Sequence, residues 1–297
     1  MPETCTICGS AETGMWYRGD AVRTEWAGQK LWDVQRCHTC GHQFTAPRPS
    51  DAELGYYYSS GYSPHTFGYG VRATMDTVIK TARETGYHRH VRITSGMDVL
   101  DVGCGGGTFL AVCQAMGADI QGVEPSADGA STCRDNNIPV HEGFLDDYLG
   151  VADRRFDLIT ANHVVEHHAE PVRLLREMKS LLKPDGKIWF SVPNAGCHAS
   201  RLLKDRWHSS DLPVHLQHFT PHSVRRMIAE AGLSLTTLKT ESENSLPGSY
   251  ANLLRRKLGV PGRLTRMIAG PALQKNAWLG RRIDASGNGE AIITEAA

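Results

Sequence analysis

The segment Val99–Leu110, with the sequence VLDVGCGGGTFL, constrains the fold more than any other. An apolar run that ends in an acid and passes directly into glycines predicts a buried strand, a tight turn and a helix. Gly103, Gly105 and Gly107 can adopt positive φ and leave room for a ligand against the backbone. The helix that begins near Thr108 directs free amide donors and the positive end of its dipole toward the same place. The segment therefore predicts a nucleotide-binding turn after the first strand of an α/β sheet.

A second predicted strand, Asp119–Val123, ends at Glu124. An acid in this place can accept hydrogen bonds from both hydroxyls of a ribose. The glycine spacing is a clean G-x-G-x-G and only approximates the dinucleotide pattern G-x-G-x-x-G. Nicotinamide and S-adenosylmethionine sites both use such an acid, so the spacing alone leaves both ligands open.

Four successive blocks carry a family resemblance: DVGCGGG, GVEP, FDLITANHVVEH and LLKPDGKIWFSVPN. Together they resemble the class I S-adenosylmethionine-dependent methyltransferases, in the branch that acts on small molecules, quinones and sugars. The resemblance extends from about Met97 to Leu233. It implies an α/β fold, a doubly wound Rossmann-like sheet of seven strands, with S-adenosylmethionine as the cofactor.

The resemblance also implies roles for individual residues. The glycine loop, with Asp101, faces the methionine part of the cofactor, and Glu124 holds the ribose. Asp146 accepts from the adenine amino group, with Asp147 as the near alternative; a helix cap or a solvated acid explains the same residues without a ligand. The remaining cofactor contacts expected from the matched blocks are Cys104, Pro125, Leu145 and Asn162.

Composition sets outer limits on function. The 297 residues are enough for one α/β domain and a smaller module. Lys+Arg and Asp+Glu both number 32, which disfavours a partner bound mainly through its phosphates, such as nucleic acid. No apolar run approaches the roughly 18 residues of a membrane span, and the N-terminal residues are not signal-like. We therefore expect a cytoplasmic protein with a small-molecule partner and no membrane contact.

Two C-x-x-C pairs lie near the start of the chain: Cys5 with Cys8, and Cys37 with Cys40. Each pair is followed at once by a glycine and can place two thiolates on one metal ion. The other four cysteines show no pattern, which favours a reducing compartment over disulfide pairs. The pattern predicts a structural Zn²⁺ site in a zinc ribbon whose strands are 15–18 and 30–35.

The role of this ribbon stays open between a structural cap and a reader of substrate or nucleic acid, and the neutral net charge of the chain favours the cap. A zinc module of this kind resembles the one that precedes the methyltransferase domain of sugar C-methyltransferases. The tyrosines at 56–58 either pack the following linker or line a substrate entrance. The predicted amphipathic helix 71–91 is a lid candidate, because the resemblance to class I methyltransferases implies that a helix ahead of the first strand covers the cofactor.

The fourth predicted strand, 156–161, runs out into Asn162, His163, Glu166 and His167. Ligands bind at the carboxyl ends of parallel strands, so substrate and methyl group should meet here. The pattern His163-x-x-Glu166-His167 also offers metal ligands, although Pro171 ends any helix too early for the inverted zinc-protease arrangement. A loop-ordering role for Glu166 and His167 remains the alternative.

His215 is the first candidate for a general base and His163 the second, since a neutral imidazole can take a proton from an attacking hydroxyl. A packed histidine that fixes the loop is the alternative for His215. Its segment, 207–221, resembles the substrate-side loop of methyltransferases of polysaccharide and secondary-metabolite synthesis. Thr220 is the expected cap of the next helix, with Pro221 at its first position.

These observations predict three parts: a zinc ribbon (1–45), a linker with the lid helix (46–95), and a methyltransferase domain (96–297) with a helical insertion at about 245–285. Further elements are expected as a helix at 126–136, a strand at 138–140, a helix at 171–182, and strands at 187–192, 233–239 and 291–294. This insertion is rich in arginine and lysine, and three interpretations of it stay open: a solvated face, a homodimer contact or a cover for an anionic substrate.

The expected activity is methyl transfer to a hydroxyl, or to carbon, of a sugar or natural-product intermediate. Two other classes remain: a nicotinamide-dependent oxidoreductase, and a zinc-ribbon interaction protein with an inactive domain.

Overall fold

In the computed structural model, which describes residues 3–21, 28, 30–59, 72–241 and 291–297, a seven-stranded sheet forms the centre of the larger part. Its order is β12-β13-β10-β9-β6-β7-β8, and β13 runs antiparallel to both of its neighbours. The predicted doubly wound Rossmann-like sheet is therefore confirmed. The strands are β6 (Asp98–Val102), β7 (Asp119–Glu124), β8 (Val140–Glu142), β9 (Phe156–Asn162), β10 (Leu182–Pro193), β12 (Leu235–Glu241) and β13 (Ala291–Ala296).

Two hydrophobic layers cover the faces of this sheet because successive strand residues point to opposite sides. In β6, Val99 packs into one layer and Leu100 into the other. The first layer involves α3 (Thr108–Ala115) and α4 (Ala127–Asp135), near α2 (Arg72–Thr85). The second involves α5 (Leu145–Leu149), α6 (Pro171–Ser180) and α8 (Pro221–Glu230).

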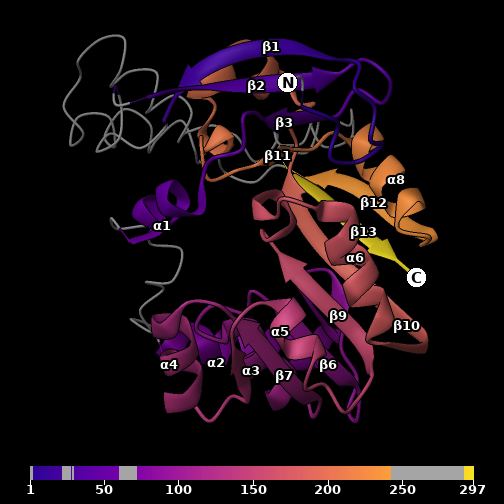
Figure 1. Cartoon of the computed structure of the whole chain (residues 1–297). Helices are drawn as coiled ribbons and strands as arrows, with labels where there is room; N and C mark the ends of the chain where they lie inside the picture. Colours follow the sequence, from indigo (N-terminus) through magenta and orange to yellow (C-terminus); the bar gives the residue numbers. More distant parts are fainter. Residues whose placement is uncertain (1–2, 22–27, 29, 60–71, 242–290) are drawn as a thin grey trace.

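A smaller four-stranded sheet lies at the other end of the molecule (Figure 1), in the order β1-β2-β3-β11. Its first three strands are β1 (Thr13–Asp20), β2 (Leu31–Cys37) and β3 (Gln43–Thr45). The fourth, β11 (Gln217–His218), comes from the segment before α8, far along the chain. The sheet of the N-terminal module therefore includes a strand from the predicted methyltransferase part.

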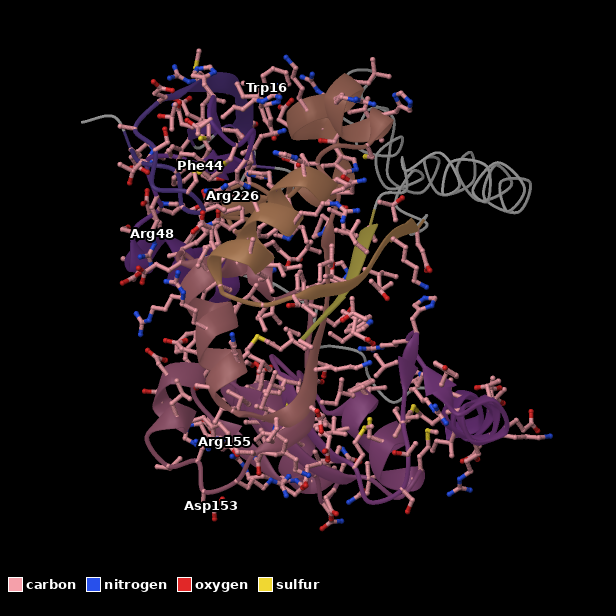
Figure 2. The ribbon with its side chains drawn as sticks, turned by 90° about the vertical axis from the view of Figure 1, so that its right-hand side faces the viewer. Trp16, Phe44, Arg48, Asp153, Arg155 and Arg226 are labelled. Atoms are coloured by element: carbon pink, nitrogen blue, oxygen red, sulfur yellow. The ribbon has the colours of Figure 1, made fainter. Side chains whose placement is uncertain are left out.

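The module also shares its core with the larger sheet. Phe44, Cys37 and Cys40 belong to the same buried cluster as Phe219 and Val224. Figure 2 shows Phe44 next to α8, which is marked by Arg226, while Asp153 and Arg155 mark the opposite end of the molecule. Burial against α8 thus adds to any stabilisation of the module by a metal.

Several predicted boundaries were wrong, each for a local reason. The helix expected at 71–91 ends at Thr85, because Gly86 has φ +73 and its amide donates to the carbonyl of Ala82, which closes the helix. The strand expected at 138–140 is 140–142, with Ile138 buried in the preceding loop. The helix expected at 171–182 ends at Ser180, and β10 already begins at Leu182.

The predicted cap of α8 is confirmed. Thr220 caps α8, with its side chain accepting from the amide of Ser223, and Pro221 is the first helical residue. Ser126 caps α4 in the same way by accepting from the amide of Gly129. The remaining elements are α1 (Asp51–Ser59), β4 (Tyr87–His88), β5 (Val91–Arg92) and α7 (His198–Leu203). The predicted insertion at 245–285 lies outside the described residues, and no described helix is long and apolar enough to cross a membrane.

Candidate functional site

The glycine loop connects the carboxyl end of β6 to α3. Gly103, Gly105 and Gly107 have φ of +69, +55 and +78. A Cβ atom on Gly103 would lie 2.5 Å from Cγ2 of Val164, and one on Gly107 would lie 2.5 Å from Cδ1 of Ile138. Gly107 is the N-cap of α3 and offers no side-chain cap, so the first amides of α3 are left for a ligand.

Glu124, at the end of β7, joins this loop through its carboxylate. Oε2 accepts from the amide of Gly105 at 2.7 Å, and Oε1 accepts from the amide of Ser126 at 2.8 Å. The side chain is 2% exposed. Each carboxylate oxygen carries a second lone pair, so both oxygens keep capacity for a ribose hydroxyl. The predicted ribose acid therefore lies directly against the predicted glycine loop.

Asp101 precedes the loop at the end of β6 and is 4% exposed. Its Oδ1 accepts from the hydroxyl of Thr160 at 2.6 Å. Burial raises the pKa of Asp101 to about 6, against the opposing effects of the Thr160 hydrogen bond and of Arg89. Thr160, on β9, carries no sequence signal that would have connected it with Asp101.

The other predicted cofactor residues are more scattered. Cys104 is buried, and its sulfur lies 3.8 Å from that of Cys133 and 3.7 Å from the carbonyl oxygen of Gly105. Leu145 is buried in the core, and Pro125 is exposed. The Asn162 side-chain oxygen accepts from the hydroxyl of Ser191 at 3.0 Å.

The two aspartates at the start of α5 have different environments. Asp147 accepts from the amide of Phe144 at 3.0 Å and so acts as a helix cap. Asp146 is exposed, with one oxygen 3.9 Å from the guanidinium of Arg173. Asp146 also accepts from the amide of Asp147 at 3.2 Å, so both carboxylates contact amides at the start of α5.

Beyond β9 the chain forms a cluster of histidines around a buried acid. His163 has φ +56, an uncommon conformation for a residue with a side chain, and its Nδ1 lies 3.1 Å from Oε1 of Glu166. Glu166 is completely buried, and among the described residues its Oε2 has no hydrogen-bond partner. Burial raises its pKa, but the His163 hydrogen bond and the charges of the surrounding histidines outweigh burial and lower the pKa to about 2.

His167 and His215 complete this cluster from two loops. Nδ1 of His167 lies 3.0 Å from the carbonyl of Val214, and Nδ1 of His215 lies 2.9 Å from that of Ser209. A carbonyl only accepts, so each Nδ1 carries a proton, and in the neutral form of either ring the lone pair lies on Nε2. The ring centroids are 4.7 Å apart, and burial lowers the pKa of His167 to about 4.

The histidine cluster borders the glycine loop, because Val164 follows His163 and occupies the space that a side chain on Gly103 would need. The structure thus brings both predicted base candidates, His163 and His215, to one place beside the predicted cofactor loop. Glu166, His167 and His215 each offer one ligand atom, all within 4.8 Å of one another.

The four paired cysteines also come together. Sγ of Cys5 lies 3.5 Å from that of Cys40, and Sγ of Cys8 lies 3.6 Å from that of Cys37. A tetrahedral zinc ion with bonds of about 2.3 Å requires sulfurs about 3.8 Å apart, so the cluster is compatible with such a site. Gly9 and Gly41 close the two knuckles with nearly equal φ of +71 and +70.

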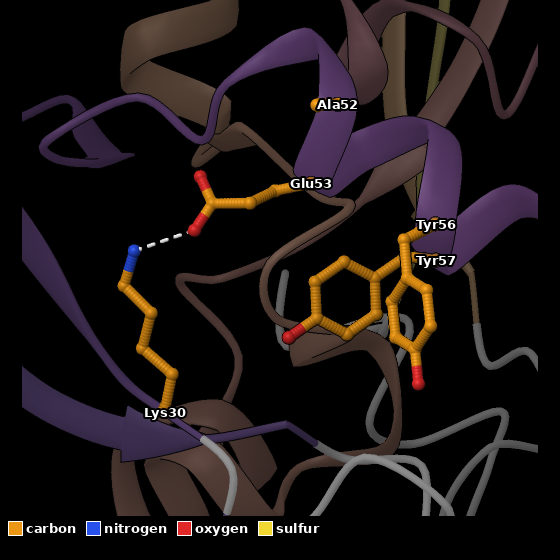
Figure 3. A pocket seen from close by; sticks show the side chains of 5 residues that line it. All are labelled: Lys30, Ala52, Glu53, Tyr56 and Tyr57. Carbon is orange, nitrogen blue, oxygen red and sulfur yellow. Dashed lines mark hydrogen bonds and ion pairs between the residues drawn. The ribbon is translucent and has the colours of Figure 1, made fainter.

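A separate cavity of about 340 Å³ lies between the start of β2 and α1 (Figure 3). Lys30 and Glu53 form an ion pair of 2.7 Å at one side of it. Tyr57 is buried and packs edge-on against Trp32, whereas Tyr56 is 50% exposed. Both tyrosines line the cavity, and Tyr57 also packs the linker against Trp32.

Comparison with known proteins agrees with this geometry. The family model described as "Methyltransferase domain" matches residues 79–238. The ubiquinone biosynthesis O-methyltransferase of Actinobacillus pleuropneumoniae serotype 5b is 30% identical over 118 residues, which cover 36% of this chain and 50% of that protein. The protein of the same name from Cereibacter sphaeroides is 32% identical over 184 residues, covering 56% and 71%. The chain thus spans only about half the length of the first of these relatives.

A crystal structure of an S-adenosylmethionine-dependent methyltransferase from Archaeoglobus fulgidus aligns with a TM-score of 0.50 and 20% identity. The alignment covers 81% of this chain and 99% of that one. This likeness supports the fold. Because the methyltransferase family model matches more than half of the residues, including the glycine loop, Glu124 and the histidine cluster, the chain belongs to the methyltransferase domain family.

Proposed function

We propose that the chain is an S-adenosylmethionine-dependent methyltransferase that acts on a hydroxyl, or on carbon, of a small molecule such as a sugar or a natural-product intermediate. The observation that carries the proposal is the contact between the glycine loop, with its positive φ angles and uncapped helix, and the buried Glu124 carboxylate. Their place at the carboxyl edge of a parallel sheet is where nucleotides bind. The relatives' name, O-methyltransferase, favours oxygen as the methylated atom.

The residues present fit this cofactor. The amides at the start of α3 suit the carboxylate of its methionine part, and Glu124 suits the ribose. Asp101 lies next to the same loop and suits the amino group, and Asp146, which is exposed at the start of α5, suits the adenine. When bound, S-adenosylmethionine supplies a methyl group on a positively charged sulfur, which is open to in-line attack.

His163 is the better-placed general base, although the sequence favours His215. Its ring is partly exposed, with 35% of the side chain accessible, and Glu166 holds its Nδ1. A buried carboxylate on one ring nitrogen directs the other nitrogen outward and stabilises the protonated ring. His163 then takes the acceptor's proton as the oxygen attacks. His215 is 7% exposed and uses Nδ1 to hold its own loop.

Calorimetric titration with S-adenosylmethionine tests the cofactor assignment. Glu124→Ala should lower affinity at least about tenfold, because a carboxylate that accepts from a hydroxyl contributes roughly 1.5–3 kcal/mol. Glu142→Ala is the matched control, since Glu142 pairs with Glu124 in register on β8 and is exposed. Equal affinity in wild type and Glu124→Ala would sink the ribose assignment. A wild-type chain that binds no cofactor would overturn the proposed activity and favour the interaction-protein alternative.

Zinc at Cys5, Cys8, Cys37 and Cys40 is part of the same proposal. Burial raises the pKa of Cys5 to about 11 and that of Cys40 above its usual range, so thiolates at both positions need a cation. Native mass spectrometry should show one zinc ion per chain, and Cys37→Ser should lose it. A folded protein that binds no zinc after incubation with an excess of the ion would contradict this assignment.

A divalent cation held by Glu166, His167 and His215 is a second candidate for the histidine cluster. It is favoured by the buried Oε2 of Glu166, which has no partner among the described residues, and by the two Nε2 lone pairs. The Nδ1 contacts to carbonyls match the way in which metal-binding histidines are usually held. Native mass spectrometry distinguishes the two candidates, since this one requires a second metal that Glu166→Gln removes while the zinc stays. A single metal per chain after loading with manganese or zinc would exclude it.

Membership of the methyltransferase domain family counts against a nicotinamide-dependent oxidoreductase. The acceptor is identified by screening hydroxylated sugars and phenols with radiolabelled methyl donor, and the position of the label then separates oxygen from carbon.

A further inference from the structure

Gln217 lies where the zinc-binding knuckles and the histidine cluster meet. It forms half of β11, the short strand that adds the segment carrying His215 to the edge of the N-terminal sheet (Figure 1). Gln217 pairs with Phe44 of β3 in antiparallel register. The side chain is 3% exposed, so every polar atom of its amide needs a protein partner.

The oxygen of the Gln217 amide faces the two knuckles. It accepts from the hydroxyl of Thr6 at 2.7 Å and lies 2.9 Å from Nε2 of His42. Thr6 lies between Cys5 and Cys8, and His42 comes two residues after Cys40. One oxygen therefore contacts both metal-binding turns at once.

The nitrogen of the same amide faces the loop after β9. It donates to the carbonyls of His168 and Ala169 at 3.0 and 3.3 Å. His168 directly follows His167, so this contact fixes the backbone that carries one imidazole of the cluster. The amide thus uses all of its hydrogen-bonding groups, two contacts toward the knuckles and two toward the site.

The other imidazole is fixed through the backbone beside Gln217. The carbonyl of His215 accepts from the hydroxyl of Thr45 at 2.9 Å, and the amide of Leu216 donates to the carbonyl of Glu166 at 2.8 Å. His215, Glu166 and His167 are therefore held against one another by a segment whose strand, β11, pairs with β3 of the N-terminal module.

We propose that Gln217 is a positioning residue that couples the folded, metal-loaded knuckles to the geometry of the histidine cluster. The inference rests on the proposed function for its consequence in catalysis, but the coupling itself is a property of the fold. A buried amide that loses partners on one side leaves polar groups unsatisfied, so the two sides change together. The N-terminal module then acts as part of the site rather than as a separate cap.

Gln217→Leu in the full, zinc-loaded chain tests the coupling. The readout is the side-chain ¹⁵N spectrum of His167 and His215, which reports whether each neutral ring carries its proton on Nδ1. We expect wild type to show the Nδ1-protonated form for both rings. In Gln217→Leu both signals should move toward the average of the two tautomers, with zinc content unchanged and cofactor affinity within about threefold of wild type.

Thr39→Ala is the matched control. Thr39 lies in the second knuckle, but its hydroxyl contacts Ser10 at 2.8 Å and not Gln217. It should leave the two histidine signals as in wild type. If Gln217→Leu does not fold, Thr6→Val removes only one contact to the amide oxygen and should move the same signals by a smaller amount.

Wild-type histidine signals in Gln217→Leu, or in Thr6→Val where it replaces that variant, would overturn the proposal. So would equal shifts in Thr39→Ala, because they would show a general loosening of the module. Failure of the proposed function has a different signature: the wild-type chain would bind no S-adenosylmethionine, while the histidine signals would still respond to Gln217→Leu.

Discussion

Asp101→Asn should make the protein more stable and a poorer cofactor binder. The carboxylate is buried, and its pKa is raised from 3.8 to about 6 by burial. At 1.36 kcal/mol per pH unit, the ionised folded state is disfavoured by about 3 kcal/mol. Asparagine keeps an oxygen that can accept from Thr160 and carries no charge, so about 3 kcal/mol is the upper limit of the gain.

The sign and the pH window follow from linkage. Between pH 3.8 and about 6 the folded chain binds the proton more strongly than the unfolded chain, so the stability of wild type falls as the pH rises through this range. Ionisation of Asp101 lowers the free energy of unfolding by about 3 kcal/mol at pH 8 and by about 1.6 kcal/mol at pH 5. The difference in free energy of unfolding between Asp101→Asn and wild type should therefore be nearly half as large at pH 5 as at pH 8.

Thermal melting at the two pH values measures this difference. For a chain of this size about 3 kcal/mol corresponds to a Tm roughly 5 °C higher at pH 8. Calorimetric titration should show weaker binding of S-adenosylmethionine to the same variant, if Asp101 contacts the amino group of the cofactor. A difference that does not change with pH, or a variant less stable than wild type at pH 8, would refute the reasoning.

Asp157→Asn is the control with the opposite sign. Burial raises the pKa of Asp157, but the hydrogen bonds from Lys183 and from the amide of Asp98 outweigh it and lower the pKa below its ordinary value. Its replacement should destabilise the protein. That loss should be the same at pH 5 and pH 8, because the group is ionised at both in the folded and unfolded chains.

Three further predictions concern the loop, the module and a helix cap. Gly103→Ala should lower the free energy of unfolding more than Gly96→Ala and should also weaken cofactor binding in calorimetry. Both glycines have φ near +70 to +77, where a Cβ adds about 1–2 kcal/mol of strain. Of the two, only Gly103 would also bring its Cβ within 2.5 Å of Val164. Similar losses in both variants would contradict the close contact. Removal of zinc with a chelator should raise hydrogen exchange in β1–β3 and β11 before it does so in β6 and β9, since a structural zinc supplies much of a small module's folding free energy; a uniform rise would contradict this. Thr220→Ala should lower the free energy of unfolding by about 1 kcal/mol in denaturant titration, because the amide of Ser223 loses its cap; an unchanged midpoint would show that another group caps α8.

Local sequence was enough for the elements whose signals are short-range. The sequence correctly places the strand, glycine turn and helix at 99–115, the acid at the end of β7 and the cap at Thr220. Strand burial, positive φ and capping depend on neighbouring residues. The two C-x-x-C pairs also come together as predicted. Each knuckle turn is set by residues close in sequence, and four thiolates that bind one metal ion must lie around that ion.

The sequence predicted the wrong bounds for a helix and a strand in which a single residue decides where the element ends or pairs. The pattern of the helix at 71–91 did not show that Gly86 would end it at Thr85. Strand β8 lies two residues later than its most apolar stretch, because Val140 and not Ile138 pairs with Gly122 of β7. Pairing register is a property of two strands, and one strand alone does not specify it.

The sequence by itself determined the fold class, the glycine loop with Glu124, and the cysteine cluster. Only the tertiary structure decided that Glu166 holds His163, that His167 and His215 share one cluster, and that β11 joins the N-terminal sheet. The contact between His42 and Gln217 spans 175 positions and has no periodic signal. Such contacts form because buried polar groups must find partners wherever the packed chain brings them, and that choice is made only when the whole core has formed.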